Sequence, residues 1–296
     1  MRRHTSVLAH IVAVCVVLVW GITFINTKLL LSSGLTPEEI FVMRFAIAYV
    51  CIWTISPRQL WCHTWRDELR MLLLGITGGS LYFAAENEAL RRTMANNVSF
   101  IVCTAPLFTV LMALVLLPGV RATHRLLAGS LTAIAGMAAI IFNGHFVLHL
   151  SPRGDMLALT AALSWAAYSL LIRSVSARYS AVFISRKVFA YGLITIVPLF
   201  AWRPWQTGIG SVLASPTIVF NILFLSLVAS FTCFVLWSWV VKELGALSSS
   251  NYIYLNPVAT CFASAAVLGE PITPIAVCGL AMVLLGVYLA NSSHSR

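Results

Sequence analysis

The chain has 296 residues, of which 60% are hydrophobic and only 9% are charged, and its formal net charge is +10. A soluble domain of this composition would expose more apolar surface than one core can bury, whereas a lipid bilayer solvates such a surface. The composition therefore excludes an ordinary soluble protein and predicts an integral membrane protein whose first partner is the lipid bilayer.

Ten apolar segments follow one another along the chain, each close to the roughly 20 residues that an α-helix needs to cross a bilayer. Lipid offers no hydrogen-bond partners to an open backbone, so these segments must be helices. We predict an all-α integral membrane fold with ten transmembrane helices. The predicted spans are residues 7–31, 40–55, 69–90, 95–117, 126–142, 156–172, 182–202, 217–241, 246–268 and 275–289.

The two halves of the chain repeat each other. Trp20 matches Trp165, Arg44 matches Arg186 and Pro106 matches Pro257, in the same order and at a nearly constant offset. Because each half holds an odd number of spans, the second half enters the membrane upside down relative to the first. We therefore predict two inverted five-helix repeats, residues 1–143 and 150–292, an architecture typical of alternating-access transporters.

The basic residues predict the orientation of these spans. With a cytoplasmic N-terminus, thirteen arginines and lysines fall in inner segments and five in outer ones. The positive-inside rule then places both termini in the cytoplasm, with the protein in the inner (plasma) membrane. The net positive charge therefore reflects topology and not a nucleic-acid partner. The inner residues are Arg2, Arg3, Arg58, Arg66, Arg70, Arg121, Arg125, Arg173, Arg178, Arg186, Lys187, Lys242 and Arg296, and the outer ones are Lys28, Arg91, Arg92, Arg153 and Arg203.

Two charged residues lie deep within predicted spans, where a charge costs roughly 2.5 to 3.5 kcal/mol at a helix centre. Arg44 and Glu86 lie several residues inside the outer ends of the second and third spans, so both have about the same depth. We expect them to face one another or to share a polar vestibule, with Asn26, Lys28 and Asn87 nearby. Two interpretations remain open, a proton or substrate relay through Glu86 and a fixed ion pair that locks two helices.

The other acidic residues of this region have simpler expected roles. Glu88 has Arg91 and Arg92 three and four residues further on, which predicts a local ion-pair cluster near the membrane surface. Glu38 and Glu39 follow Pro37 at the start of the second helix, where negative charge suits a helix N-terminus.

Several short motifs recur at fixed places along the chain. They are Trp20-Gly21 with Phe24, then Pro37, Arg44, Ala89-Leu90, Pro106 and Leu268-Gly269-Glu270 before a glycine-spaced last span. Jointly they resemble the EamA-type transporters of the drug/metabolite transporter superfamily, over nearly the whole chain and both halves. The resemblance implies ten helices around a central substrate cavity, and export of small metabolites, amino acids or drugs. One departure is Leu117-Pro118-Gly119-Val120, which lacks the glutamate that many relatives carry after the fourth span.

If that arrangement holds, aromatic and amide side chains line the cavity. An aromatic ring can stack on an apolar or cationic substrate and still leave its polar edge for a hydrogen bond. Asn256 stands directly before Pro257, whose missing amide hydrogen frees a carbonyl one turn earlier. Trp239, Tyr252 and Asn251 are further candidates of the same kind. For every one of these residues the alternative role is structural: packing, anchoring at the membrane interface or tethering of helices. The predicted substrate-binding residues are Trp20, Tyr82, Asn87, Trp165, Tyr168, Trp237, Tyr254 and Asn256.

Glycines mark one face of the last span in each half. Gly129 and Gly136, like Gly279 and Gly286, are seven residues apart and return to nearly the same helical face. Small residues there allow close helix contact, either within the chain or at a dimer seam. Ten spans complete a transporter by the resemblance, so we expect a monomer.

Together these features predict a secondary transporter, an exporter working by alternating access and coupled, in one reading, to protons. A nucleotide-sugar or lipid-head-group carrier of the same fold is the alternative, and it would need a basic cavity. An intramembrane enzyme is the competing class, but His145 and His149 are its only metal-like feature and an interfacial pair is favoured. We predict no catalytic residues, no metal site and no cofactor.

Overall fold

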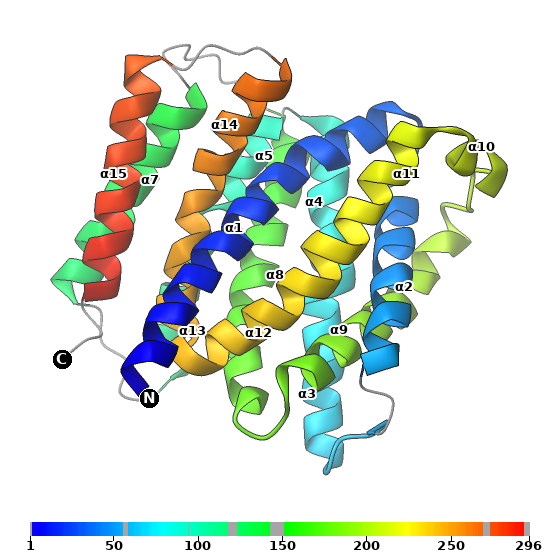
Figure 1. Cartoon of the computed structure of the whole chain (residues 1–296), viewed down its shortest axis with the longest axis horizontal. Helices are drawn as coiled ribbons and strands as arrows, with labels where there is room; N and C mark the ends of the chain where they lie inside the picture. Colours follow the sequence, from blue (N-terminus) through cyan, green and yellow to red (C-terminus); the bar gives the residue numbers. More distant parts are fainter. Residues whose placement is uncertain are drawn as a thin grey trace.

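The computed structural model describes residues 2–55, 59–93, 95–117, 123–142, 151–268 and 273–292. All regular secondary structure in these ranges is helical (Figure 1). Some features of the sequence analysis lie outside the described residues: the His145 and His149 pair, Pro118-Gly119-Val120, the Gly269-Glu270 motif, and the basic residues Arg58, Arg121 and Arg296. The described helical stretches that are long and apolar enough to cross a membrane are Val7–Ser32, Asn97–Leu116, Pro152–Ser176, Ala181–Ala201, Pro216–Leu244 and Pro274–Asn291, with a shorter apolar helix at His124–Ile140. The chain is therefore a multi-pass membrane protein, as its composition predicts.

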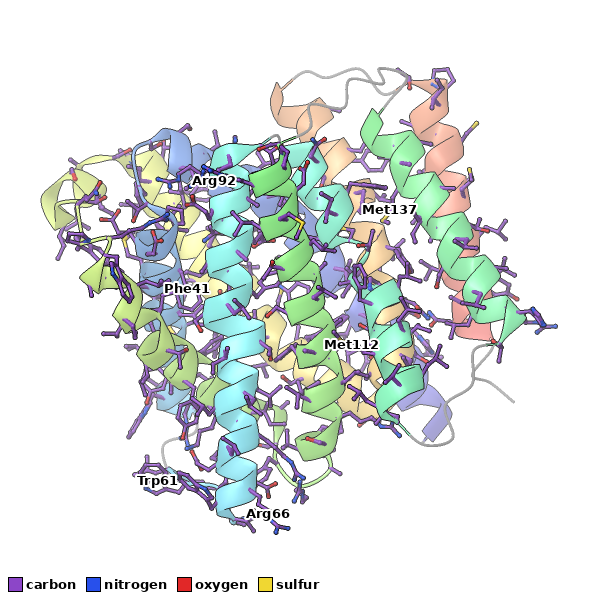
Figure 2. All side chains as sticks on the ribbon, turned by 180° about the vertical axis from the view of Figure 1, so that it is seen from behind. Phe41, Trp61, Arg66, Arg92, Met112 and Met137 are labelled. Carbon is purple, nitrogen blue, oxygen red and sulfur yellow. The ribbon has the colours of Figure 1, made fainter. Side chains whose placement is uncertain are left out.

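The first half of the chain begins with two single helices and continues with two composite ones. A π-helical turn, η1, joins α3 to α4, so that these three elements form one continuous rod. Figure 2 shows this rod with Arg66 near one end and Arg92 near the other. The elements are α1 (Arg2–Ser32), α2 (Pro37–Ile55), α3 (Trp65–Gly75), η1 (Ile76–Ser80), α4 (Leu81–Arg92), α5 (Ala95–Val102), α6 (Ala105–Leu116) and α7 (His124–Phe142).

The second half contains the same kinds of composite helix in the same order. The elements are α8 (Pro152–Ser176), α9 (Ala181–Ile196), the 3-10 turn η2 (Val197–Ala201), α10 (Ile209–Ala214), α11 (Pro216–Leu223), the π-helix η3 (Phe224–Thr232), α12 (Cys233–Leu244), α13 (Ala246–Ser250), the 3-10 turn η4 (Asn251–Leu255), α14 (Asn256–Leu268) and α15 (Pro274–Ser292). The start of α1 and the end of α15 lie at the same end of the bundle in Figure 1. We call this the lower end, and the end at which α4 stops the upper end.

Helix irregularities occur at matching places in the two halves. The π-helical turn η1 interrupts the third helix of the first half, and η3 interrupts the corresponding helix of the second. Helices also break before the matched prolines, because α6 begins one residue before Pro106 and α14 one residue before Pro257. A π-helical turn widens the helix and frees backbone carbonyls for other partners, which is common at functional sites.

The glycine faces pack α7 against α15, which lie side by side at one edge of the molecule (Figure 1). A Cβ atom placed on Gly129 would come within 2.5 Å of the backbone nitrogen of Ala290, and one on Gly286 within 2.5 Å of that of Ala133. Only glycine permits this approach of two helix backbones. Of the two roles considered for these glycines, the structure shows contact within the chain.

Candidate functional site

A small cavity lies among helices of both halves, at the centre of the described bundle. Its volume is about 30 Å³, the share of liquid volume of about one water molecule and roughly a tenth of a small ligand pocket. The cavity as shown is therefore much smaller than an ordinary ligand pocket. Its lining consists of Trp20, Thr23 and Phe24 of α1, Arg44 of α2, Tyr82, Phe83 and Glu86 of α4, Val102 of α5, Trp165 of α8, Phe234 of α12, Ile253 of η4 and Asn256 of α14.

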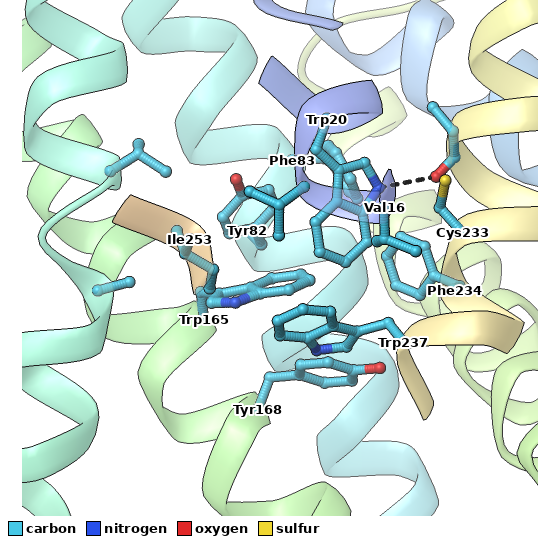
Figure 3. Close-up of a cluster of buried hydrophobic side chains, with 14 of the residues drawn as sticks. Val16, Trp20, Tyr82, Phe83, Trp165, Tyr168, Cys233, Phe234, Trp237 and Ile253 are labelled. Atoms are coloured by element: carbon cyan, nitrogen blue, oxygen red, sulfur yellow. Dashed lines mark hydrogen bonds between the residues drawn. The ribbon is translucent and has the colours of Figure 1, made fainter. Parts of the chain in front are cut away.

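The matched tryptophans of the two halves meet at this cavity. The ring of Trp20 contacts that of Trp165 edge to face, with centroids 5.2 Å apart and an interplanar angle of 87°. Figure 3 shows both indoles grouped with Tyr82, Phe234 and Trp237. Edge-to-face contacts of this kind add to the free energy gained by burial alone. The cavity is thus bounded by a continuous aromatic cluster.

The two indole N–H groups have different surroundings. Trp20 Nε1 donates to the backbone oxygen of Ala229, 2.9 Å away in η3 (Figure 3). Trp165 Nε1 is buried and has no hydrogen-bond partner among the described residues. A carbonyl of η1 also accepts a bond from the other half, since Ser164 Oγ donates to Thr77 O at 2.8 Å. Both π-helical segments therefore bond to the helix that carries the opposite half's tryptophan.

Arg44 is held at the cavity by a polar and an aromatic contact. Its Nε donates to Ser230 Oγ in η3, and its guanidinium carbon lies 4.3 Å from the centre of the Phe83 ring. The whole residue is only 3% exposed. A buried arginine is costly unless its charge is compensated, so these contacts and a nearby negative charge are needed to keep it there.

That negative charge is Glu86, which lines the same cavity. The hydroxyl of Tyr82 donates to Glu86 Oε1 at 2.9 Å, and Arg44 and Glu86 interact electrostatically. Among the described residues, however, these two side chains form no direct ion pair. They share an aromatic cavity, which differs from the polar vestibule expected from the sequence, and each charge has a separate neutral partner.

Close helix contact at Gly21 places α1 against α14 next to the cavity. A Cβ atom at Gly21 would lie 2.4 Å from the backbone oxygen of Asn256, and Thr260 Oγ1 donates to Gly21 O at 2.7 Å. The Trp20-Gly21 pair thus combines a cavity side chain with the glycine that lets the neighbouring backbone approach. Trp20 and Asn256 line the cavity from these two helices.

Four of the eight predicted substrate-binding residues lie in the cavity wall: Trp20, Tyr82, Trp165 and Asn256. Two others are in the next layer, because Trp237 contacts Trp20 with ring centroids 5.1 Å apart and Tyr168 contacts Trp165 at 5.0 Å. Tyr254 is fully buried outside the lining.

The remaining polar residues expected near the charged pair bond elsewhere. Asn87 Nδ2 donates to Pro37 O at 3.2 Å, Lys28 Nζ to the backbone oxygen of Leu90 at 2.5 Å, and Asn26 to Asn221 at 2.5 Å. These three therefore tie helix ends together at the upper end and do not join the cavity.

Several cavity residues were not predicted from the sequence. Thr23 follows Trp20 by one helical turn and Phe234 precedes Trp237 by the same interval, so helical spacing from the predicted tryptophans could have suggested both. Phe83 adjoins Tyr82, but neighbours in a helix normally face different directions. No sequence signal points to Ser230, whose role depends on the π-helical turn.

At the lower end, Asp67 joins the two halves. Arg70 on the same helix lies 2.8 Å from Asp67 Oδ1, as does Arg178 of the second half, and the Tyr179 hydroxyl donates to Oδ2 at 3.1 Å. Burial opposes ionisation of this carboxyl, but the hydrogen bonds of Tyr179, Arg70 and Thr64 and the charge of Arg178 outweigh it and lower its pKa.

Glu68 forms a second connection at this end. Its Oε1 accepts hydrogen bonds from Lys187 Nζ and the Tyr191 hydroxyl, both on α9, and its Oε2 accepts from the backbone nitrogen of Cys62 at 2.8 Å. Burial again opposes ionisation, and these bonds outweigh it, so the pKa of Glu68 is also lowered. The lower end is thus closed by two carboxylates of α3: Asp67 is held by Arg178, in the turn after α8, and Glu68 by Lys187 of α9.

At the upper end, Arg203 of the second half joins two carboxylates of the first half. Its Nη1 lies 2.9 Å from both Glu38 Oε1 and Glu88 Oε2. The predicted local cluster of Glu88 with Arg91 and Arg92 is confirmed, at 2.8 and 2.6 Å. Arg203 was not among the predicted partners, because it is more than a hundred residues away in the chain.

Glu39 has the capping role that its position predicts. Its Oε2 accepts from the backbone nitrogen of Thr36 at 2.9 Å, while Thr36 Oγ1 accepts from Glu39 N at 3.3 Å, a reciprocal capping box. Its Oε1 also accepts from the backbone nitrogens of Gln206 and Thr207, at 2.6 and 2.8 Å. One carboxylate therefore caps α2 and fixes the segment before α10. Glu38, in the same turn, pairs with Arg203 instead.

Comparison with known proteins gives a consistent result. The family model described as the EamA-like transporter family matches residues 7–142 and 152–292. A protein of Archaeoglobus fulgidus named "Uncharacterized transporter" is 27% identical over 291 residues, covering 97% of this chain and 98% of its own. A protein of Escherichia coli named "Probable amino-acid metabolite efflux pump" is 25% identical over 296 residues, covering 98% and 95%.

A more similar segment occurs in a protein of Streptantibioticus cattleyicolor named "Probable terminal-alkyne amino-acid exporter", 30% identical over 226 residues and covering 76% of this chain and 74% of its own. One solved crystal structure superimposes with a TM-score of 0.72 at 16% identity, covering 97% of this chain and 96% of that one, which shows a shared fold. With both matched regions spanning nearly all of its sequence, the chain belongs to the EamA-like transporter family, membrane transporters of the drug/metabolite transporter superfamily.

Proposed function

We propose that this protein exports small metabolites, amino acids or drugs across the inner (plasma) membrane by alternating access, with protons as the coupling ion. The observation that carries the proposal is the pair Arg44 and Glu86, two opposite charges buried in the wall of one aromatic cavity. Charged residues at membrane depth generally mark substrate or ion pathways. A cavity shared by both halves is also where alternating access needs its binding site.

The architecture behind this function is ten crossings in two inverted five-helix repeats, residues 1–143 and 150–292. The matched π-helical turns η1 and η3, and the helix breaks before Pro106 and Pro257, support this repeat. The start of α1 and the end of α15 at one end of the bundle suit an even number of crossings, with both termini cytoplasmic (Figure 1). The chain acts as a monomer, since its glycine faces are occupied by α7 and α15 themselves.

The conformation shown corresponds to the occluded step of such a cycle. The cavity of about 30 Å³ is too small for a metabolite, and ion pairs join the two halves at both ends. Access from the cytoplasm requires Asp67 to separate from Arg178, and access from outside requires Arg203 to leave Glu38. Two closures at opposite ends, opened in turn, are the minimum for alternating access.

Glu86 couples export to protons because a proton and a cationic group of the substrate compete for its carboxylate. In this scheme a cationic group of the substrate binds Glu86 from the cytoplasmic side, and a proton from outside displaces it. Arg44 stays fixed on Ser230 and Phe83, and binds the negative group of a zwitterionic substrate. The aromatic walls contact the remainder of the substrate.

The names of the relatives support an amino-acid derivative as substrate. The names of the exporter of Streptantibioticus cattleyicolor and of the efflux pump of Escherichia coli both contain the word "amino-acid". A zwitterion also fits one arginine and one glutamate in a single cavity. A nucleotide-sugar carrier would need a basic cavity, whereas Arg186 is absent from the described lining and only Arg44, balanced by Glu86, is present.

Efflux from liposomes tests this function. A thermal-shift screen of amino acids, metabolites and drugs on the purified protein selects the compound, which is then loaded into liposomes containing the protein. An imposed pH gradient should accelerate wild-type efflux about tenfold and should have no effect on Glu86→Gln. The matched control is Glu243→Gln, at an exposed position of α12. Gradient-dependent efflux by Glu86→Gln would reject Glu86 as the relay, and chemical conversion of the compound without movement would reject transport.

A further inference from the structure

A second, larger cavity lies on the outside of the bundle, away from the aromatic cavity. Its volume is about 520 Å³, within the range of small-molecule sites. It opens to the surface, since Leu81 in its wall is 42% exposed and Trp202 is 79% exposed. Figure 2 shows this face, with the α3–η1–α4 rod running down its middle. We call this cavity the α4 groove; its lining is Glu38, Ile76, Ser80, Leu81, Ala84, Ala85, Glu88, Leu157, Thr160, Thr195, Ile196, Leu199, Trp202 and Arg203.

The long walls of the α4 groove are apolar. Its hydroxyl groups are already bonded within the protein, because Ser80 Oγ and Thr195 Oγ1 are 2.7 Å apart and Thr160 Oγ1 donates to Met156 O at 2.8 Å. Along the rod, the wall extends from Ile76 to Glu88, about 18 Å at 1.5 Å per residue. That length is close to one leaflet of hydrocarbon, about 15 Å.

The upper end of the groove is charged and contains one unusual atom. Glu38 is only 4% exposed; its Oε1 pairs with Arg203, but its buried Oε2 has no hydrogen-bond partner among the described residues. A buried carboxylate oxygen without a donor is costly, and a donor from outside the chain would remove that cost. Trp202 is beside Arg203 at this end, and exposed tryptophans favour the head-group level of a bilayer.

The same end offers a cation for a negative group. Arg203 uses Nη1 for both carboxylates, while its side chain is 41% exposed. A guanidinium has five N–H donors, so others remain for a phosphate. Glu38 and Arg203 therefore place a buried carboxylate oxygen that lacks a donor and further guanidinium donors at the end of an apolar channel about one leaflet long; Oε2 would have to turn toward the groove to accept from a head group.

We propose that the α4 groove binds a zwitterionic membrane lipid with a primary ammonium group, namely phosphatidylethanolamine. The acyl chain lies along Ile76, Leu81 and Ala84, the phosphate contacts Arg203, and the ammonium donates to Glu38 Oε2. Phosphatidylcholine has no N–H donor for Glu38, and phosphatidylglycerol has no cationic group. The site is separate from the aromatic cavity, and it shares the Glu38–Arg203 pair with the outer closure of the proposed cycle; lipid binding to the conformation shown requires no transport.

Native mass spectrometry of the full-length protein in detergent tests this site, using the three lipids with identical dioleoyl chains. Wild-type protein should bind phosphatidylethanolamine about tenfold more tightly than the other two. Glu38→Gln should remove that preference, and Glu243→Gln should retain it. Equal affinities in the wild type, a preference for phosphatidylglycerol, or a preference that survives Glu38→Gln would overturn the proposal.

A second variant tests the apolar part of the groove and keeps the proposal falsifiable if Glu38→Gln does not fold. Ala84→Phe places a ring in the groove and should lower the retention of all three lipids at least about tenfold. Ala135→Phe, on the exposed surface of α7, is the matched control and should leave retention unchanged. Undiminished phosphatidylethanolamine retention by Ala84→Phe would show that the lipid binds elsewhere.

Discussion

Arg44 donates a hydrogen bond from Nε to the hydroxyl of Ser230, which lies in the π-helical segment η3. This bond fixes the guanidinium over the Phe83 ring, 4.3 Å from its centre, and away from a direct pair with Glu86. The charge of Glu86 consequently faces the cavity, and its hydrogen-bond partner in the part of the chain that the structure describes is the Tyr82 hydroxyl. A proton relay needs a carboxylate that is not bound directly to a cation, whereas in a fixed ion pair with Arg44 the Glu86 carboxylate would not be available to a proton.

Ser230→Ala should free the Arg44 guanidinium from its position over the Phe83 ring. The buried Arg44 Nε donor would lose its partner, at a cost of roughly 1 to 3 kcal/mol. We expect a lower melting temperature in detergent and weaker dependence of efflux on the pH gradient, because Arg44 can then move onto Glu86. The control is Ser226→Ala, an equally buried serine of η3 whose hydroxyl bonds Ile222 O on its own helix at 2.6 Å. Identical melting temperatures and coupling in the two variants would contradict this prediction.

The matched tryptophans should respond differently to the same substitution. Trp20→Phe removes the hydrogen bond to Ala229 O, so we expect a loss of roughly 0.5 to 1.5 kcal/mol in stability. Trp165→Phe removes an N–H that bonds to no described residue, so stability should change little. If the Trp165 N–H contacts substrate, affinity in the thermal-shift assay should instead fall several-fold. Equal destabilisation by both variants would show that the indoles are equivalent.

The contact between α7 and α15 predicts a strong effect of added volume. Gly129→Ala places a Cβ atom 2.5 Å from the backbone nitrogen of Ala290, and the two helices can separate only by losing other contacts. We expect destabilisation of roughly 1 to 3 kcal/mol, measured as a fall in melting temperature. Gly210→Ala is the control, since no heavy atom lies within 4 Å of that added Cβ. A melting temperature of Gly129→Ala equal to that of Gly210→Ala would contradict the close contact.

Acid should open the lower end. Because the folded protein lowers the pKa of Asp67 below its ordinary value of about 3.9, this group stabilises the fold above that pH and loses the effect as the pH falls through the lowered pKa. The melting temperature should therefore decrease below pH about 4. Asp67→Asn should weaken that decrease, and Glu243→Gln should leave it intact. The prediction is wrong if wild type and Asp67→Asn lose stability in parallel.

Much of the fold was predictable because a segment that crosses lipid must be apolar and must satisfy its own backbone hydrogen bonds as a helix. Composition predicts a membrane protein, and six of the ten predicted spans match described helices that are long and apolar enough to cross a membrane. The spacing of Gly129 and Gly136 predicts close helix contact, although only the structure shows α15 as the partner. Family membership followed from motifs spread over both halves, and the family comparison confirms it.

The site was predictable only in part. Depth along a helix follows from counting residues, so Arg44 and Glu86 could be placed at one level. The direction in which a side chain points is harder to predict, because each extra residue in a π-helical turn rotates all later side chains about the helix axis by about 100°. Asn87 is beside Glu86 in sequence yet bonds to Pro37, while Ser230 faces Arg44 because of η3.

The sequence by itself determined the solvent in which this protein folds, the approximate helices and the polar residues that lipid could not tolerate. These are local properties, since hydropathy and helical periodicity act within a single segment. Only the tertiary structure decided which of those residues meet: Trp20 with Trp165, Arg44 with Ser230, and Arg203 with Glu38 and Glu88. Contacts between distant segments depend on the rotation and crossing of whole helices, which no single segment contains.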